Sequence, residues 1–285
     1  MSSTTTRPPR DRFEDRVREW DVVINQTLET ESSLIGFGTR ADQPVVLKVI
    51  RQPGDEWRSG EILDAFDGKG VVRVHEYVEG AVLLERLSPG NSLVDIALNG
   101  RDDEATEILA DVIQKMSPRQ LLKAPVAVED WAKGFERYSA SGDDQIPESL
   151  VEKGHRVYLE LCRSQSKRRL LHGDLHHYNV LFDSDRGWLA IDPKGVVGEI
   201  EYEIGALLRN PYEKPELFTQ PSTVERRLKR LASRLSLDSR RGLAWGFAQA
   251  VLSAVWGVED GFAVDAQNPC IVLAEAIRPM LEMQS

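Results

Sequence analysis

The stretch "RRLLHGDLHHYNVLFDSDRGWLAIDPKG", residues 168–195, gathers several reactive side chains into one short segment. Three histidines and Asp174 fall within residues 172–177, and Asn179 follows two positions later. An apolar run and a turn then lead to Asp192. Such a segment can be a metal site, a core loop whose polar groups satisfy one another, or a phosphate-transfer site. The choice among the three decides what the rest of the chain is for.

A metal site is the first alternative. His172, His176 and His177 together with Asp174 could ligate zinc, for which histidine is a common ligand. Zinc ligands usually converge from a helix or from several strands, whereas this run leads straight into a predicted hairpin. The chain has only five histidines in all, so few further ligands are available. A histidine-based metallohydrolase stays open, and tightly bound zinc in the purified protein would favour it.

Phosphate transfer explains the order of the residues, which a core loop would not require. A kinase-type site needs one carboxylate to orient the attacking hydroxyl and accept its proton. It also needs an amide and a second carboxylate to hold Mg²⁺ against nucleotide phosphates. Asp174 is predicted to be the base, with Asn179 at the spacing of a kinase catalytic-loop asparagine. Asp192, at the end of the second predicted strand, is predicted to be the main metal ligand.

The chain changes character near Ser88-Pro89-Gly90. Before this break, apolar and β-branched runs separated by turns predict strands, and one helical stretch interrupts them. Beyond it, apolar residues recur at helical spacing, apart from one hairpin. Together these patterns predict an α+β protein. The predicted strands are 22–29, 32–40, 44–50, 71–78, 81–87, 180–183 and 188–192, and the predicted helices are 54–66, 102–116, 148–163, 222–235 and 242–258.

Composition excludes some classes of function. The formal net charge of −10 argues against a basic nucleic-acid-binding face. The two cysteines cannot form a disulfide framework. Residues 1–20 carry no apolar signal segment and are predicted to be a frayed polar tail. The uncharged stretch 242–258 is shorter than the ~20 residues of a membrane span and contains Gln249, so we expect a buried helix and a cytoplasmic protein.

HGDLHHYNVLF followed by WLAIDPKG resembles the aminoglycoside phosphotransferase family of kinase-like enzymes. The branch it is most similar to holds streptomycin 6-phosphotransferases and hydroxyurea phosphotransferases, and GEIEYEIGALLRNP, residues 198–211, adds to the likeness. The resemblance runs from about residue 20 to the C-terminus. It implies a protein-kinase-like fold with two lobes. A nucleotide-binding N-lobe over 21–88 would hold a small antiparallel sheet and one helix, and a mostly helical C-lobe over 89–285 would hold the catalytic loop and the acceptor pocket.

The resemblance also implies residues for the nucleotide. Lys48, in the strand PVVLKVI, would hold the α- and β-phosphates, paired with a glutamate of the following helix. The family pattern favours Glu56, and Glu61 remains an alternative. No G-x-G-x-x-G loop precedes this lysine. The short turn at Ser32 and Ser33 would contact phosphate instead.

Further assignments concern the lobe junction and the catalytic loop. In LLERL, the carbonyl of Glu85 and the N–H of Leu87 would bind adenine, as a kinase hinge does. His172 would brace the catalytic loop, and Glu203 resembles a structural acidic residue of the family. No role is assigned to His176 or to its neighbour His177.

These features predict an ATP- and Mg²⁺-dependent small-molecule O-phosphotransferase, with an aminoglycoside of the streptomycin type or hydroxyurea as acceptor. A kinase of another hydroxyl metabolite, such as an amino sugar or a choline-like alcohol, and a nucleotide-binding pseudokinase module are the alternatives. No activation segment for a protein substrate follows Asp192. A cationic acceptor would meet acidic residues of the C-lobe, and a monomer is expected. The candidates for that contact are Glu199, Glu259, Asp260 and Asp265. The phosphorylated hydroxyl and the choice of ATP over GTP stay open.

Overall fold

The computed structural model describes residues 7–118 and 125–283, which form two compact units. The first unit holds the described residues of Met1–Asn91, Lys115–Lys123 and Leu181–Gly195. The second holds those of Ser92–Gln114, Ala124–Val180 and Val196–Ser285. These units are defined by packing rather than by function, so the lobe boundaries predicted above stay predictions.

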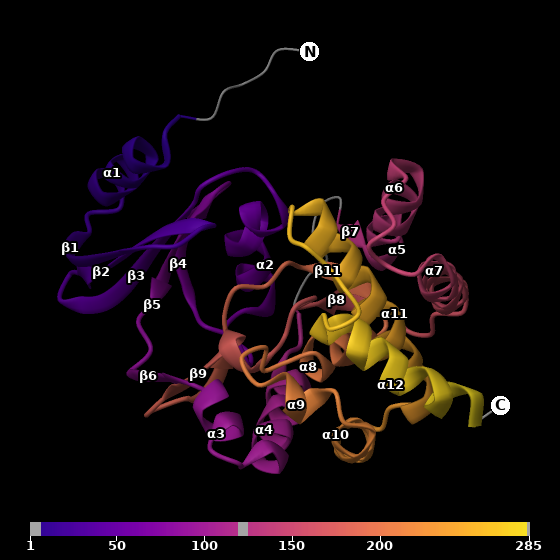
Figure 1. The fold of residues 1–285 in the computed structure, drawn as a ribbon. Coiled ribbons are helices and arrows are strands. Elements are labelled where there is room, and N and C mark those ends of the chain that lie inside the picture. The colour runs from indigo at the N-terminus through magenta and orange to yellow at the C-terminus, as the bar shows by residue number, and fades with distance from the viewer. Residues whose placement is uncertain (1–6, 119–124, 284–285) are drawn as a thin grey trace. The chain divides into compact units, whose positions relative to one another are not determined.

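An antiparallel five-stranded sheet forms the centre of the first unit, in the order β1-β2-β3-β5-β4 (Figure 1). A 3₁₀ helix and an α-helix lie between β3 and β4 in the sequence, as predicted. Ala41 and Asp42 join β2 to β3 with φ of 46° and 63°, the left-handed backbone that tight hairpins require. The elements are β1 (Val23–Glu29), β2 (Ser33–Arg40), β3 (Gln43–Ile50), η1 (Asp55–Arg58), α2 (Ser59–Phe66), β4 (Val74–Val78) and β5 (Ala81–Glu85).

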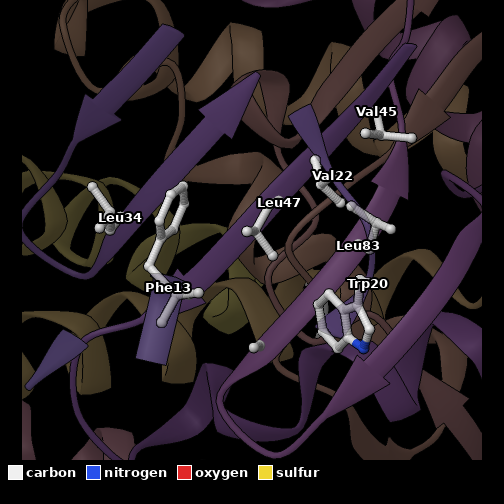
Figure 2. Packing of buried hydrophobic residues seen from close by; sticks show 9 residues of the cluster. Phe13, Trp20, Val22, Leu34, Val45, Leu47 and Leu83 are labelled. Carbon is white, nitrogen blue, oxygen red and sulfur yellow. The ribbon is translucent and has the colours of Figure 1, made fainter. Parts of the chain in front are cut away.

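Helix α1 (Pro9–Glu19) covers one face of this sheet, where the sequence predicts a frayed tail. Proline at the first helical position suits the helix start. Phe13 and Trp20 pack against Leu47 and Leu83 of the central strands, as Figure 2 shows. Most side chains of this helix are polar, and only a narrow apolar face packs on the sheet. So narrow a face does not stand out as a periodic pattern in the sequence. The prediction of a frayed tail is therefore wrong for these residues.

The two faces of the sheet carry different side chains, because successive residues of a strand point to opposite sides. On β3, Val45, Leu47 and Val49 belong to the cluster beneath α1. Val46 and Lys48, in between, line a cavity on the other face. The predicted hairpin is present as β9 (Val180–Asp183) and β10 (Gly187–Ala190), with β6 (Pro89–Ser92) beside β9.

Helices make up most of the second unit. The stretch expected to be a buried helix is the core of α11, which packs against α7, α8 and α12 (Figure 1). Trp245 and Leu252 of this helix are fully buried. No helix among residues 7–118 and 125–283 is long and apolar enough to cross a membrane. The helices are α3 (Val94–Leu98), α4 (Asp102–Lys115), α5 (Val128–Trp131), α6 (Lys133–Ser141), α7 (Glu148–Arg163), α8 (Ile204–Leu208), α9 (Pro215–Phe218), α10 (Pro221–Leu235), α11 (Ser239–Glu259) and α12 (Pro269–Met283).

A small sheet in the order β7-β11-β8 accompanies these helices. Its strands are β7 (Val126–Ala127), β8 (Arg169–Leu171) and β11 (Val196–Gly198), and the 3₁₀ helices η2 (His177–Asn179) and η3 (Ile200–Glu203) lie close to them in the sequence. The segment after β8 carries Asp174 and Asn179. The predicted α+β class is confirmed.

Candidate active site

Lys48 is the centre of an ion-pair cluster in the first unit. Its side chain is only 6% exposed, and Nζ lies 2.8 Å from both Glu56 Oε2 and Asp192 Oδ1. Burial alone would lower the pKa of Lys48, but the two carboxylates outweigh it and raise the pKa above its usual value. The ammonium group is therefore held charged inside the protein, which is costly unless it is paired.

The structure decides between the two glutamates that the sequence left open. Glu56 lies in η1 and bonds Lys48 directly. Glu61 lies in the first turn of α2 and pairs instead with Arg58, at 2.7 Å. The partner of Lys48 is Glu56.

Asp192 adopts an unusual backbone conformation. Its φ of 55° is in the left-handed region, which aspartate tolerates better than most residues other than glycine. Gly195 follows with φ of 70°, and a Cβ there would lie 2.4 Å from a side-chain carbon of Ile62. Such conformations are concentrated at functional sites. The backbone directs the Asp192 carboxylate to Lys48 rather than letting β10 continue.

A cavity of about 300 Å³ lies beside this cluster, within the first unit. Its walls are mostly apolar, and the charged lining residues are Lys48, Glu85, Arg86 and Asp192. Both predicted hinge residues, Glu85 and Leu87, line it. The remaining lining residues are Ile35, Phe37, Val46, Val72, Leu84, Pro89, Gly90, Leu181 and Ile191.

The side chain of Glu85 is used within the protein. Its carboxylate accepts the backbone N–H of Arg73 at 2.8 Å and also bonds the guanidinium of Arg186. Arg186 lies in the β9–β10 turn and also donates to the Val71 carbonyl at 3.4 Å. This network holds the Glu85 side chain at the end of β5, and adenine binding by its backbone stays a prediction.

The serine turn is ordered by its own hydrogen bonds. Ser33 is buried and its hydroxyl lies 2.9 Å from that of Thr30, while Ser32 is exposed. The Ser32 carbonyl accepts the N–H of Arg51 at 2.7 Å. Gly36 lies within β2, so it does not form a glycine-rich loop. Phosphate binding by this turn stays a prediction.

Asp174 and Asn179 lie together in the second unit. Asn179 Nδ2 donates to the carbonyl of Asp174 at 3.0 Å, which closes the loop between them. The N–H of Asp174 donates to Nδ1 of the fully buried His172 at 3.3 Å. The bond joins His172 to the backbone at the start of this loop, and its bracing role stays a prediction.

Glu203 supports the same loop from η3. It is almost fully buried, and its carboxylate accepts the backbone N–H groups of His172 and Gly173, the latter at 3.2 Å. Burial raises the pKa of Glu203 to about 7, against the opposing effect of these two hydrogen bonds. The family-like acidic residue therefore acts here as a buried anchor for the segment before Asp174.

One neighbour of Asp174 was not predicted. Arg209 Nη2 lies 3.3 Å from Asp174 Oδ1, while His176 Nε2 lies 3.8 Å from Oδ2. Arg209 stands 35 positions along the chain, in the ALLRNP text that supported the family resemblance. That text was the only signal in the sequence that could have drawn attention to it.

The histidines do not form a metal cage. His177 is fully buried, and both of its ring nitrogens lack a hydrogen-bond partner. Burial holds the pKa of His177 well below its usual value, so the ring is neutral. Among the described residues, no group of three or more histidine, cysteine, aspartate or glutamate side chains is arranged to hold a metal ion.

The acidic residues proposed for the acceptor fall into two groups. Glu199 is fully buried and accepts from Trp245 Nε1 at 2.6 Å, from Ser166 N at 3.1 Å, and from Arg241. These contacts make it a structural residue, and we do not carry it into the acceptor site. Glu259 is paired with Arg137 at 2.7 and 2.9 Å near the exposed end of α11. Beyond it, Asp260 and Asp265 are exposed.

The fold of the chain matches solved structures of choline and aminoglycoside kinases. It superposes on choline kinase LicA from Streptococcus pneumoniae with a TM-score of 0.63, at 14% identity over 96% of this chain and 98% of that one. It superposes on aminoglycoside phosphotransferase APH(4)-Ia, solved with ADP and hygromycin B, with a TM-score of 0.65, at 14% identity over 95% and 97% of the two chains. Identities this low establish the fold alone, and the predicted kinase-like fold is confirmed.

Sequence comparison then gives the family. The family model for aminoglycoside/hydroxyurea antibiotic resistance kinases matches residues 19–261, and the chain belongs to this family. It is 35% identical to streptomycin 3''-kinase of Klebsiella pneumoniae over 83% of this chain and 88% of that one. It is 29% identical to streptomycin 6-kinase of Streptomyces griseus, over 87% and 81%. Hydroxyurea phosphotransferase of Kitasatospora aureofaciens is 31% identical, over 76% and 66%. The chain is therefore a small-molecule phosphotransferase, as predicted.

Proposed function

We propose that this protein transfers the γ-phosphoryl group of ATP to a hydroxyl of a streptomycin-type aminoglycoside. The observation that carries the proposal is the paired lysine at the wall of an apolar cavity. Lys48, held by Glu56 and Asp192, offers a fixed positive charge beside a space suited to a flat base. Similarity to streptomycin kinases over most of the chain supports the acceptor.

The residues present fit a magnesium nucleotide. Mg²⁺ prefers oxygen ligands and usually binds one or two carboxylates besides the phosphates. Asp192 and Asn179 each offer a side-chain oxygen and keep the role of metal ligand that the sequence assigns to them. Lys48 would hold the α- and β-phosphates, with Ser32 and Ser33 as further phosphate contacts. Bound Mg²⁺ would neutralise charge on the phosphate oxygens.

Asp174 would orient the acceptor hydroxyl and take its proton late in the transfer. The bond from the Asp174 N–H to His172 Nδ1 and the bond from Arg209 to the carboxylate hold Asp174 in place. Positioning of this kind supplies much of the rate in phosphoryl transfer, because the transition state is loose and needs little covalent help.

Hydroxyurea is the second candidate acceptor, because a hydroxyurea phosphotransferase is also similar over much of the chain. We propose that a cationic acceptor contacts the acidic residues Glu259, Asp260 and Asp265. We further propose a cytoplasmic monomer that binds no nucleic acid, with lobes over 21–88 and 89–285. Nucleic-acid binding has no support in a chain of net charge −10.

The test is consumption of Mg·ATP by the purified protein with streptomycin, other aminoglycosides, hydroxyurea, choline and amino sugars. We expect turnover with streptomycin and a product heavier by one phosphoryl group, whose position is then read by NMR. Turnover with hydroxyurea and with no other compound would show that hydroxyurea, and not streptomycin, is the acceptor. Silence across the panel would contradict the proposed acceptor, while a thermal shift with Mg·ATP would still support the nucleotide site.

A further inference from the structure

Arg209 connects Asp174 to the core of the second unit. The arginine follows α8 and its side chain is only 10% exposed. Nη2 of its guanidinium lies 3.3 Å from Asp174 Oδ1, and Nη1 lies 3.2 Å from Gln249 Oε1. Two nitrogens of one rigid, planar group are thus bonded to two different elements. The direction of the group toward Asp174 is therefore fixed.

Gln249 is itself held in one orientation. Its Nε2 donates to the carbonyl of Tyr202 at 2.6 Å, so its Oε1 must face Arg209. Gly205 makes this close approach possible, because a Cβ there would lie 2.2 Å from the Gln249 side chain. Gln249 is 3% exposed on α11. The support of Arg209 is therefore as rigid as the helix core behind it.

The bond to Arg209 differentiates the two oxygens of Asp174. Oδ1 is directed toward the guanidinium, whereas the Oδ2 contact with His176 is longer, at 3.8 Å. A carboxylate with one oxygen held in this way keeps one rotamer and presents its other oxygen in a constant direction. Strong charge-assisted bonds measure about 2.7–2.9 Å. At 3.3 Å the direction of this contact therefore depends on the fixed position of the guanidinium, which Gln249 supports.

We propose that Arg209 is a positioning residue for phosphoryl transfer, which holds Asp174 Oδ1 so that Oδ2 is presented to the acceptor hydroxyl. The inference rests on the proposed function, because it takes Asp174 as the base. It assigns Arg209 no contact with the substrate. Its effect should therefore fall on turnover and not on nucleotide binding.

Two substitutions test this directly. Arg209→Gln removes the positive charge and the two guanidinium nitrogens that bond Asp174 and Gln249. We expect kcat to fall by about 100-fold, as it does when a catalytic base is misplaced by about 1 Å. Arg209→Lys keeps the charge on a shorter group, so kcat should fall by only about 10-fold. The KM for ATP should stay within about twofold of the wild type in both, since Lys48 is unchanged. Gln249→Leu removes the support of Arg209 and should lower kcat by an intermediate factor.

Arg241 provides the matched control. It is a half-buried arginine of the second unit whose guanidinium pairs with the buried carboxylate of Glu199, and its Nη2 lies 2.8 Å from the Leu161 carbonyl oxygen. Arg241→Lys should lower the melting temperature and leave kcat of the folded enzyme unchanged. A purely structural role for Arg209 would give this same result.

The outcomes separate the two proposals. Absence of acceptor turnover in the wild-type protein would overturn both. Wild-type turnover with equal kcat in Arg209→Gln, Arg209→Lys and Gln249→Leu would overturn the positioning role alone. A fall in kcat that Arg209→Lys partly restores, at an unchanged KM for ATP, would support it. If Arg209→Gln does not fold, the lysine and Gln249→Leu variants give the same decision.

Discussion

Replacing Asp174 with asparagine removes a carboxylate but keeps the shape of the side chain. We expect kcat to fall by about 10³-fold, because asparagine cannot take the proton of the acceptor hydroxyl. Binding of Mg·ATP should survive, since Lys48 and Glu56 are untouched. Steady-state kinetics and a thermal shift with Mg·ATP measure the two effects. Asp185→Asn, in the exposed turn before β10, is the control, and comparable kcat in both variants would contradict the role of Asp174.

The raised pKa of Glu203 predicts that the stability of the protein depends on pH. Its pKa of about 7 in the folded protein lies above the ordinary 4.5, so between these values the folded state binds more protons than the unfolded state. Raising the pH then favours unfolding, and the stabilisation present below pH 4.5 is lost as the pH rises through 7. The full effect is on the order of 3 kcal/mol.

The matched variant is Glu203→Gln, which keeps an acceptor oxygen for His172 and Gly173 but does not titrate. Urea unfolding at a series of pH values between 5 and 8 gives the slope for each protein. The variant should lose less stability than the wild type over this range. Equal slopes would show that another group controls the pH dependence.

Local spacing predicted the three residues Asp174, Asn179 and Asp192, and the family resemblance implied the nucleotide-binding residues. What both missed depends on contacts between distant parts of the chain. Asp174 and Asn179 are five positions apart, and Asp192 ends a recognisable hairpin, so one short window contains all three. Arg209 meets Asp174 across 35 positions, and no periodicity reveals such a pair. Glu199 was assigned to a cationic acceptor on its charge and on the family resemblance. Its burial depends on Trp245 and Arg241, 46 and 42 positions away.

At the level of elements, the long amphipathic helices and the alternating strands were predictable. The stretch 148–163 coincides with α7. Four strands of the large sheet fall within the predicted runs, and β3 begins one residue before its run. The strands β7, β8 and β11 have only two or three residues each, too few for a period to show. Their pairing joins residues far apart in the chain, since Val196 pairs with both Val126 and Leu171.

The packing of helix α1 on the sheet can be tested by substitution. Phe13 is 7% exposed against the sheet, in the cluster that Figure 2 shows. Phe13→Ala should destabilise the protein by about 3 kcal/mol or more, because it removes a buried ring and leaves a cavity. Glu14→Ala, exposed on the same helix, is the control and should change stability by less than about 0.5 kcal/mol. If both variants unfold at the same urea concentration, α1 does not contribute to the core.

For the molecule as a whole, charge is the property that bears on the acceptor. The chain carries 46 acidic and 36 basic side chains, a net charge of −10. Such a protein attracts cations over distances set by the Debye length, about 30 Å at 0.01 M salt and about 8 Å at physiological ionic strength. Streptomycin carries guanidinium groups and is cationic, whereas hydroxyurea is neutral. The two candidate acceptors should therefore respond differently to salt.

We expect kcat/KM for streptomycin, measured at saturating Mg·ATP, to fall by up to about 10-fold between low and physiological ionic strength. Saturating nucleotide removes the opposite effect of salt on an anionic substrate, so the change reports on the acceptor alone. Hydroxyurea serves as the neutral control, and its kcat/KM should be nearly constant if the enzyme accepts it. Glu259→Gln combined with Asp260→Asn should flatten the streptomycin response if the exposed end of α11 supplies the field. A flat streptomycin response in the wild type would mean that the acidic surface does not take part in acceptor capture.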